Sequence, residues 1–74
     1  MSIARVTEIS STSTKSFEDA IQGGVKRATA TLRNVRSAWV KEQQIKIEGG
    51  NITEYQVNMM ITFVLEEGDQ GDIA

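Results

Sequence analysis

A chain of 74 residues can form only one small domain, which buries only about 60% of the surface that the unfolded chain exposes. The sequence has no Cys and no His, which excludes disulfides, zinc clusters and catalytic sites that pair a nucleophile with an imidazole. We therefore expect stability to come from association of like chains, the other usual support for a domain of this size.

The charge balance and the N-terminal run indicate which partners to expect. A formal net charge of −2 with scattered Lys and Arg disfavours nucleic acid, which requires a basic stripe. Residues 2–8 alternate in polarity and have no long apolar core, so they indicate neither a signal peptide nor a membrane span. Together with the lack of Cys, this pattern favours a cytoplasmic protein that binds no membrane.

The first expected element is a short strand over residues 3–9, rich in β-branched types and followed by a polar Ser/Thr loop at 10–14. Ser16, with Glu18 and Asp19 behind it, is typical of a helix start, because a hydroxyl caps free amides and acids suit the helix dipole.

An amphipathic helix is expected over about 16–33, because apolar residues recur there at steps of three and four. They are Phe17, Ile21, Val25, Ala28 and Leu32. Gly23 and Gly24 interrupt this pattern at a cost of about 1 kcal/mol each relative to Ala, which predicts that another backbone approaches closely there.

Two long strands are expected over 37–48 and 52–66, and the intervening Glu48-Gly49-Gly50-Asn51 is a strong hairpin signal. The C-terminal run is acidic and glycine-rich without an apolar period, so we expect a folded domain at 1–67 and a disordered tail at 68–74. The acids of this tail lack the regular spacing of an EF-hand loop, so no metal site is expected.

A two-residue loop at Gly49-Gly50 pairs residues whose numbers sum to 99, which sets Trp39 opposite Met60 and Gln43 opposite Gln56. One face is then almost entirely apolar and suits the helix: Ala38, Val40, Val57, Met59, Ile61, Phe63 and Leu65. The other face is mixed: Trp39, Lys41, Gln43, Ile45, Ile47, Gln56, Asn58, Met60 and Thr62. One helix cannot cover both faces, so the mixed face is expected to be an interface or a ligand site.

The order strand, helix, hairpin predicts an α+β fold with a three-stranded antiparallel sheet wrapped around one helix. Such a sheet keeps free edges, which copies of the chain can cover in a closed assembly. The same register points Glu42 and Glu54 to opposite faces, so they are not expected to form an acid/base couple, and no enzyme activity is expected.

Several segments, taken in order over residues 3–67, resemble the dodecin family. They are Arg5–Ile9, the Ser/Thr run, Ser16–Gln22, Thr31–Asn34, Val40–Glu42 and Tyr55–Val57. The resemblance implies a β-α-β-β protomer, a hollow homododecamer, and flavin pairs stacked between aromatic side chains near threefold contacts.

Five residues are candidates for cofactor binding when the family's flavin site is carried onto this sequence: Trp39, Gln56, Ser37, Gln44 and Lys41. Ser37 stands where flavin-binding members have a tryptophan, and the indole lies two residues further on. Gln56 matches the glutamine that hydrogen-bonds the flavin edge. Gln44 and Val64 stand where many bacterial members have arginines that reach the ligand's ribityl or phosphate part.

The resemblance implies a flavin-binding and flavin-storing protein for riboflavin or FMN, in which Trp39 stacks on the flavin. In the alternative interpretation, Trp39 and Met60 fill a contact between subunits, and the assembly is structural or holds another ligand such as coenzyme A. Gln56 could likewise bond its symmetry mates instead of a ligand.

Overall fold

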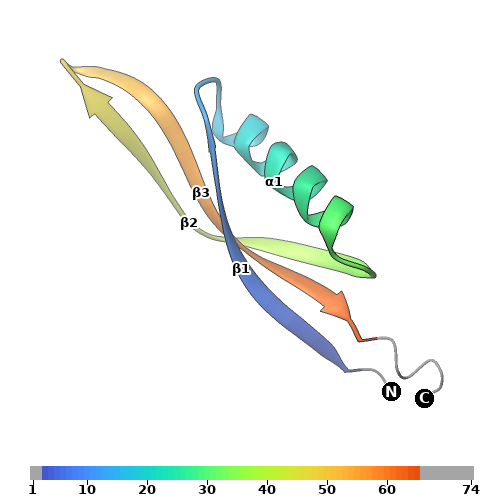
Figure 1. Cartoon of the computed structure of the whole chain (residues 1–74). Helices are drawn as coiled ribbons and strands as arrows, with labels where there is room; N and C mark the ends of the chain where they lie inside the picture. Colours follow the sequence, from blue (N-terminus) through green and yellow to red (C-terminus); the bar gives the residue numbers. More distant parts are fainter. Residues whose placement is uncertain (1–2, 66–74) are drawn as a thin grey trace.

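The computed structural model describes residues 3–65, which form one sheet and one helix (Figure 1). The elements are β1 (Ala4–Ser13), α1 (Phe17–Thr31), β2 (Val35–Glu48) and β3 (Asn51–Val64). The sheet is antiparallel, has the order β1-β3-β2 and carries α1 on one face. The predicted β-α-β-β fold is confirmed, whereas the tail expected at 68–74 lies outside the described residues.

Strand β1 is longer than predicted, because the Ser/Thr run continues the strand as far as Ser13 and is not a loop. Residues 10–13 pair with residues 58–55 of β3, which satisfies their backbone groups. The hydroxyl of Ser11 donates to the carbonyl of Ala20 in α1 at 2.7 Å. Alternate hydroxyls of the run therefore tie the sheet to the helix, and the prediction failed because small polar residues suit loops and hydrogen-bonded strands alike.

Helix α1 begins where its cap predicts, since Ser16 Oγ accepts a hydrogen bond from the Asp19 amide at 2.9 Å. Its buried face is centred on small residues, Ala20, Gly24 and Ala28, whereas the larger apolar residues of the expected stripe flank this line and are partly buried. Three fully buried residues of β3 lie beneath: Val57, Met59 and Ile61.

The close approach predicted at the glycine pair is confirmed for Gly24 alone. A Cβ there would collide with Met59 Cε and lie 3.2 Å from Ser11 Cβ, whereas a Cβ at Gly23 would meet nothing within 4 Å. The atoms that approach Gly24 belong to side chains of β1 and β3 of the same chain and not to the backbone that the sequence predicted, and Gly24 lets the helix lie close to the sheet.

The hairpin is also confirmed. Gly49 and Gly50 have positive φ angles of 58° and 80°, and Glu48 pairs with Asn51 across them. Positive φ at both central residues defines a type I′ turn, whose twist matches that of the flanking strands and which favours glycine.

The register departs from the prediction between two irregularities, one at Lys46/Ile47 and one at Val40/Glu42. In that interval Gln44 is opposite Gln56 and Gln43 is opposite Val57, so the predicted Gln43–Gln56 pair is wrong. The second irregularity restores the predicted register, and Trp39 opposite Met60 is confirmed. A β-bulge adds one residue to one strand, so two bulges on opposite strands shift the pairing and then reset it.

The shifted interval also changes which face some side chains occupy. Ile45 pairs with Tyr55, whose ring packs edge-on against Phe17 of α1 at 5.1 Å, so Ile45 lies on the helix side of the sheet. Glu42 pairs with Asn58 and therefore shares a face with Glu54, contrary to the prediction. These two positions are about 13 Å apart along the strands, too far for a shared acid/base couple.

The chain is elongated because α1 packs over β1 and β3 and leaves β2 almost bare. Its principal extents are 55 × 19 × 13 Å and its Cα radius of gyration is 15.5 Å, whereas a compact domain of this length would have about 11 Å. Every residue of β2 after Val35 is exposed. Within residues 3–65 no helix is long and apolar enough to cross a membrane.

Candidate functional site

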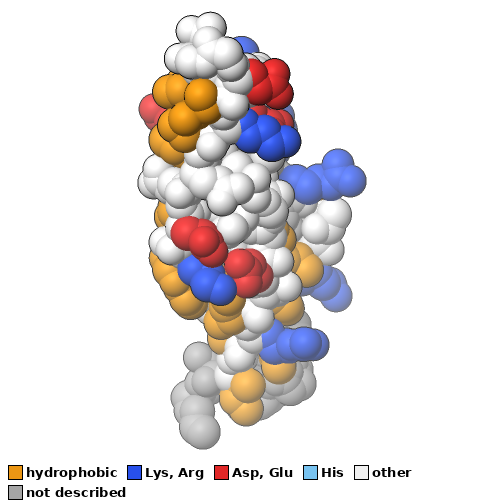
Figure 2. Space-filling model, turned by 90° about the vertical axis from the view of Figure 1, so that its left-hand side faces the viewer, with side chains coloured by type: hydrophobic (Ala, Val, Ile, Leu, Met, Phe, Trp, Pro, Cys, Tyr) orange, Lys and Arg blue, Asp and Glu red, His pale blue; other side chains and the backbone are white. Residues whose placement is uncertain are grey.

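The sheet face opposite α1 has no covering element within residues 3–65, and we call it the open face (Figure 2). The register and the ion pairs give its residues: Val6, Glu8, Ser10 and Thr12 of β1; Ser37, Trp39, Lys41, Glu42, Gln44 and Lys46 of β2; Glu54, Gln56, Asn58, Met60 and Thr62 of β3. Because strands side by side bring alternate residues to one surface, these side chains form cross-strand rows.

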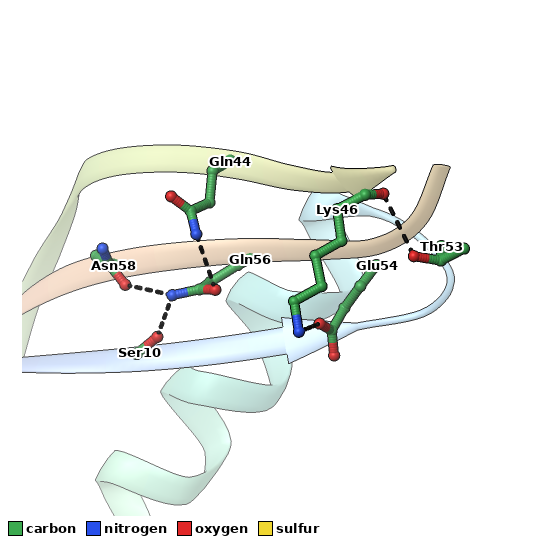
Figure 3. Close-up of polar contacts among 7 residues, drawn as sticks. All are labelled: Ser10, Gln44, Lys46, Thr53, Glu54, Gln56 and Asn58. Carbon is green, nitrogen blue, oxygen red and sulfur yellow. Dashed lines mark hydrogen bonds and ion pairs between the residues drawn. The ribbon is translucent and has the colours of Figure 1, made fainter. Parts of the chain in front are cut away.

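Gln56 is the centre of a hydrogen-bonded group that we call the amide row, formed by Ser10, Gln44, Gln56 and Asn58 (Figure 3). Gln56 Oε1 accepts from Gln44 Nε2 at 3.2 Å. Gln56 Nε2 donates to Ser10 Oγ at 2.9 Å and to Asn58 Oδ1 at 3.3 Å. Both amide protons of Gln56 are therefore used, and its oxygen keeps one lone pair for a ligand donor.

The aromatic part of the open face is Trp39, which lies opposite Met60 and is 52% exposed. Met60 and Gln56 are four residues apart on β3, about 13 Å of strand. One copy of the chain thus presents a flat indole surface and a fixed amide group on the same face but at separate places. A ligand that touches both must lie along this face or between two copies of it.

Ser37 pairs with Thr62 and shares the open face with Trp39, as the sequence predicts for an indole displaced by two residues. Lys41 reaches across the central strand, and its Nζ lies 3.3 Å from Glu8 Oε1. Of the five predicted site residues, the structure brings Gln44 and Gln56 into direct contact, places Ser37 beside Trp39 along one strand, and pairs Lys41 with an acid.

Sequence reasoning missed two members of the amide row. Ser10 was assigned to a loop, although a run that contains threonine is also compatible with a longer strand. Asn58 was placed on the correct face but not recognised as a site residue. Its position two residues after Gln56 was the available signal, because residues two apart on a strand share a face.

Comparison with known proteins shows the family to which the chain belongs. The dodecin family model matches residues 3–66. The dodecin of Thermus thermophilus is 37% identical over 65 residues, which cover 88% of this chain and 94% of that protein. The structure of the dodecin from Streptomyces coelicolor has a TM-score of 0.84 and 34% identity, and the match covers 90% of this chain and 96% of that one.

A third similar protein is described as a calcium-chelating antigen, the calcium dodecin of Mycobacterium tuberculosis, with a TM-score of 0.75 and 31% identity. That match covers 86% of this chain and 91% of the other. The match over nearly the whole chain, at this identity, shows that the chain belongs to the dodecin family. This membership makes it a small non-enzymatic protein.

Proposed function

We propose that this protein is a flavin-binding storage protein that sequesters riboflavin or FMN within a cytoplasmic homododecameric shell. One observation carries the proposal: the open face holds both a half-exposed indole, Trp39, and an amide, Gln56, whose orientation is fixed by its neighbours. Trp39, Gln56, Ser37, Gln44 and Lys41 remain the proposed ligand-binding residues, and Ser10 and Asn58 join them through the amide row.

The chemistry of the two groups suits a flavin. An indole offers a flat, polarisable surface on which an aromatic ring can stack. The free lone pair of Gln56 Oε1 can accept the ring N–H of the flavin's imide edge, and the amide of Asn58 can donate to a neighbouring carbonyl. A ring held against an indole has its excited state quenched by electron transfer, so storage and photoprotection require no catalytic acid or base.

The exposed apolar surface supports the assembly. Seven large apolar side chains are exposed within residues 3–65: Ile3, Val6, Trp39, Val40, Ile45, Ile47 and Ile52. Both outer strands, β1 and β2, also have a free edge. Copies of the chain that pair these edges and cover these side chains remove both kinds of unsatisfied surface, as a closed symmetric oligomer does.

Titration of riboflavin with the purified protein tests the binding proposal. We expect the fluorescence of the flavin to fall to a small fraction of its free value as the site fills. Unchanged fluorescence at protein concentrations up to tens of micromolar, with riboflavin passing freely through a dialysis membrane, would exclude flavin storage.

A second candidate function is an assembly without flavin, structural or holding another ligand such as coenzyme A. It is favoured by the position of Trp39 opposite Met60 on an uncovered face, which suits packing between subunits, and by Ser37 at the family's aromatic position. Within residues 3–65 no group of three or more His, Cys, Asp and Glu could hold a metal ion, so calcium is not part of either proposal.

A further inference from the structure

The open face carries two basic side chains, and a carboxylate holds each of them. Lys41 Nζ lies 3.3 Å from Glu8 Oε1. Lys46 Nζ lies 3.3 Å from Glu54 Oε1, the pair drawn in Figure 3. The first pair spans the central strand β3, so its ammonium is directed along the face towards β1. Neither lysine is a free cation in the structure.

The remaining charges make this face unsuitable for an anion. Glu42 lies on the open face opposite Asn58 and forms no ion pair within residues 3–65. In Figure 2 the basic side chains on the face lie beside acidic ones, and further basic side chains project from one edge. With two lysines and three glutamates, the face has a net charge of −1.

The other basic residues of the chain lie outside the stretch of the open face from Trp39 to Lys46. Lys26 and Arg27 belong to α1, and Lys15 and Arg33 flank it. Arg5 pairs with Phe63 on the helix side of the sheet, and Arg36 is the extra residue at the irregularity between Val35 and Ser37, before this stretch. The stretch that carries the indole and the amide row therefore contributes no unpaired cation.

A phosphate group needs such a cation. A phosphate monoester carries a charge of about −1.5 to −2 at neutral pH and is usually held by charge-assisted hydrogen bonds from Lys, Arg or backbone amides. To bind here it must share a lysine with the glutamate that already pairs with it, on a face that carries excess negative charge. A polyol chain without phosphate meets neither obstacle and can bond to amides and hydroxyls.

From this charge arrangement we propose that the open face selects an uncharged flavin, riboflavin, over its phosphorylated form FMN. The inference rests on the proposed function and narrows the ligand class to a neutral ring system with a polyol tail. The same exclusion applies to other ligands that carry phosphate groups.

Parallel fluorescence titrations of the full-length protein with riboflavin and FMN test this selectivity at low ionic strength, where charge effects are largest. We expect riboflavin to bind at least tenfold more tightly than FMN. Equal or tighter binding of FMN would overturn the selectivity and leave flavin storage standing. Binding of neither flavin would overturn flavin storage, and the selectivity with it.

A charge-neutralising variant tests whether the pairing of Lys41 with Glu8 causes this selectivity. Glu8→Gln frees Lys41 and removes one negative charge, so we expect FMN affinity to rise several-fold relative to riboflavin. Glu18→Gln makes the same charge change on the exposed first turn of α1, away from the open face, and should leave the ratio of the two affinities as in the parent. A ratio unchanged by Glu8→Gln, or changed equally by both variants, would show that the paired lysine does not set the selectivity.

Discussion

Gln44 of β2 donates a hydrogen bond to Gln56 of β3 at 3.2 Å, and this contact exists because the strand register is shifted by one between two bulges. In the unshifted register Gln43 would face Gln56. The shift turns Gln43 to the helix side, opposite Val57, and fixes the amide of Gln56 from the β2 side. The orientation of the proposed ligand-binding amide thus depends on a local irregularity of the hairpin.

The adjacent glutamines provide a matched test of this arrangement. Gln44→Ala removes the donor that orients Gln56, and one hydrogen bond of about 1 kcal/mol corresponds to a fall in riboflavin affinity of about fivefold. Gln43→Ala makes the same change one residue away, on the opposite face. We expect riboflavin titrations of this control to match the parent, and a larger loss in Gln43→Ala than in Gln44→Ala would contradict the register.

Replacement of Trp39 separates ligand stacking from subunit packing. Trp39→Ala removes the proposed stacking surface, so we expect riboflavin affinity to fall at least about tenfold. Trp39→Phe keeps an aromatic face, so its riboflavin affinity should fall by less than that of Trp39→Ala. The mass of each variant, measured by light scattering, should equal that of the parent. An assembly that dissociates in Trp39→Ala, together with parent-like binding in any remaining oligomer, would favour the packing role instead.

The two glycines of α1 are predicted to respond in opposite directions to the same substitution. Gly23→Ala adds a methyl group in open space and should stabilise the fold by about 0.5–1 kcal/mol, because glycine is a poor helix former. Gly24→Ala places the same group against buried Met59 and Ser11, and overpacking of this kind costs about 1–3 kcal/mol.

Urea midpoints measure the change in stability that each of these two substitutions causes. All variants must be compared at one fixed protein concentration, because the stability of an oligomer depends on concentration. The Gly23→Ala variant serves as the control for the general effect of alanine on the helix. Stabilisation by both substitutions would show that α1 does not lie as close to β1 and β3 as the structure has it.

The helix cap offers a further stability test. Ser16→Ala removes the side chain that accepts from the Asp19 amide, and loss of such a cap costs about 1 kcal/mol of unfolding free energy. Ser16→Asp keeps an acceptor at the same position and should retain most of the stability. The urea midpoint should therefore fall for the first variant only, and equal midpoints for both would exclude a capping role.

The sequence was sufficient for the features that depend on local chemistry. The cap at Ser16, the apolar spacing of α1 and the Gly49-Gly50 turn each follow from the preferences of a few adjacent residues, and the structure confirms them. The alternation of polarity in the hairpin also identified the face left bare by the helix.

Features that depend on pairing between distant parts of the chain could not be predicted from the sequence. No glycine or proline in residues 35–48 or 51–64 marks the bulges, so the exchange of Gln43 for Gln44 had no local signal. The strand conformation of Ser10 depends on its pairing with Asn58, far away in sequence. The ion pair of Lys41 with Glu8 likewise requires the central position of β3 between β1 and β2.

The central claim is that one helix covers only one face of this sheet, so that like chains must shelter the rest. The mass of the protein in solution, measured by light scattering at low micromolar concentration, tests it most directly. We predict a single species of twelve copies of the 8.2 kDa chain, about 98 kDa. A folded, stable monomer at that concentration would contradict the claim.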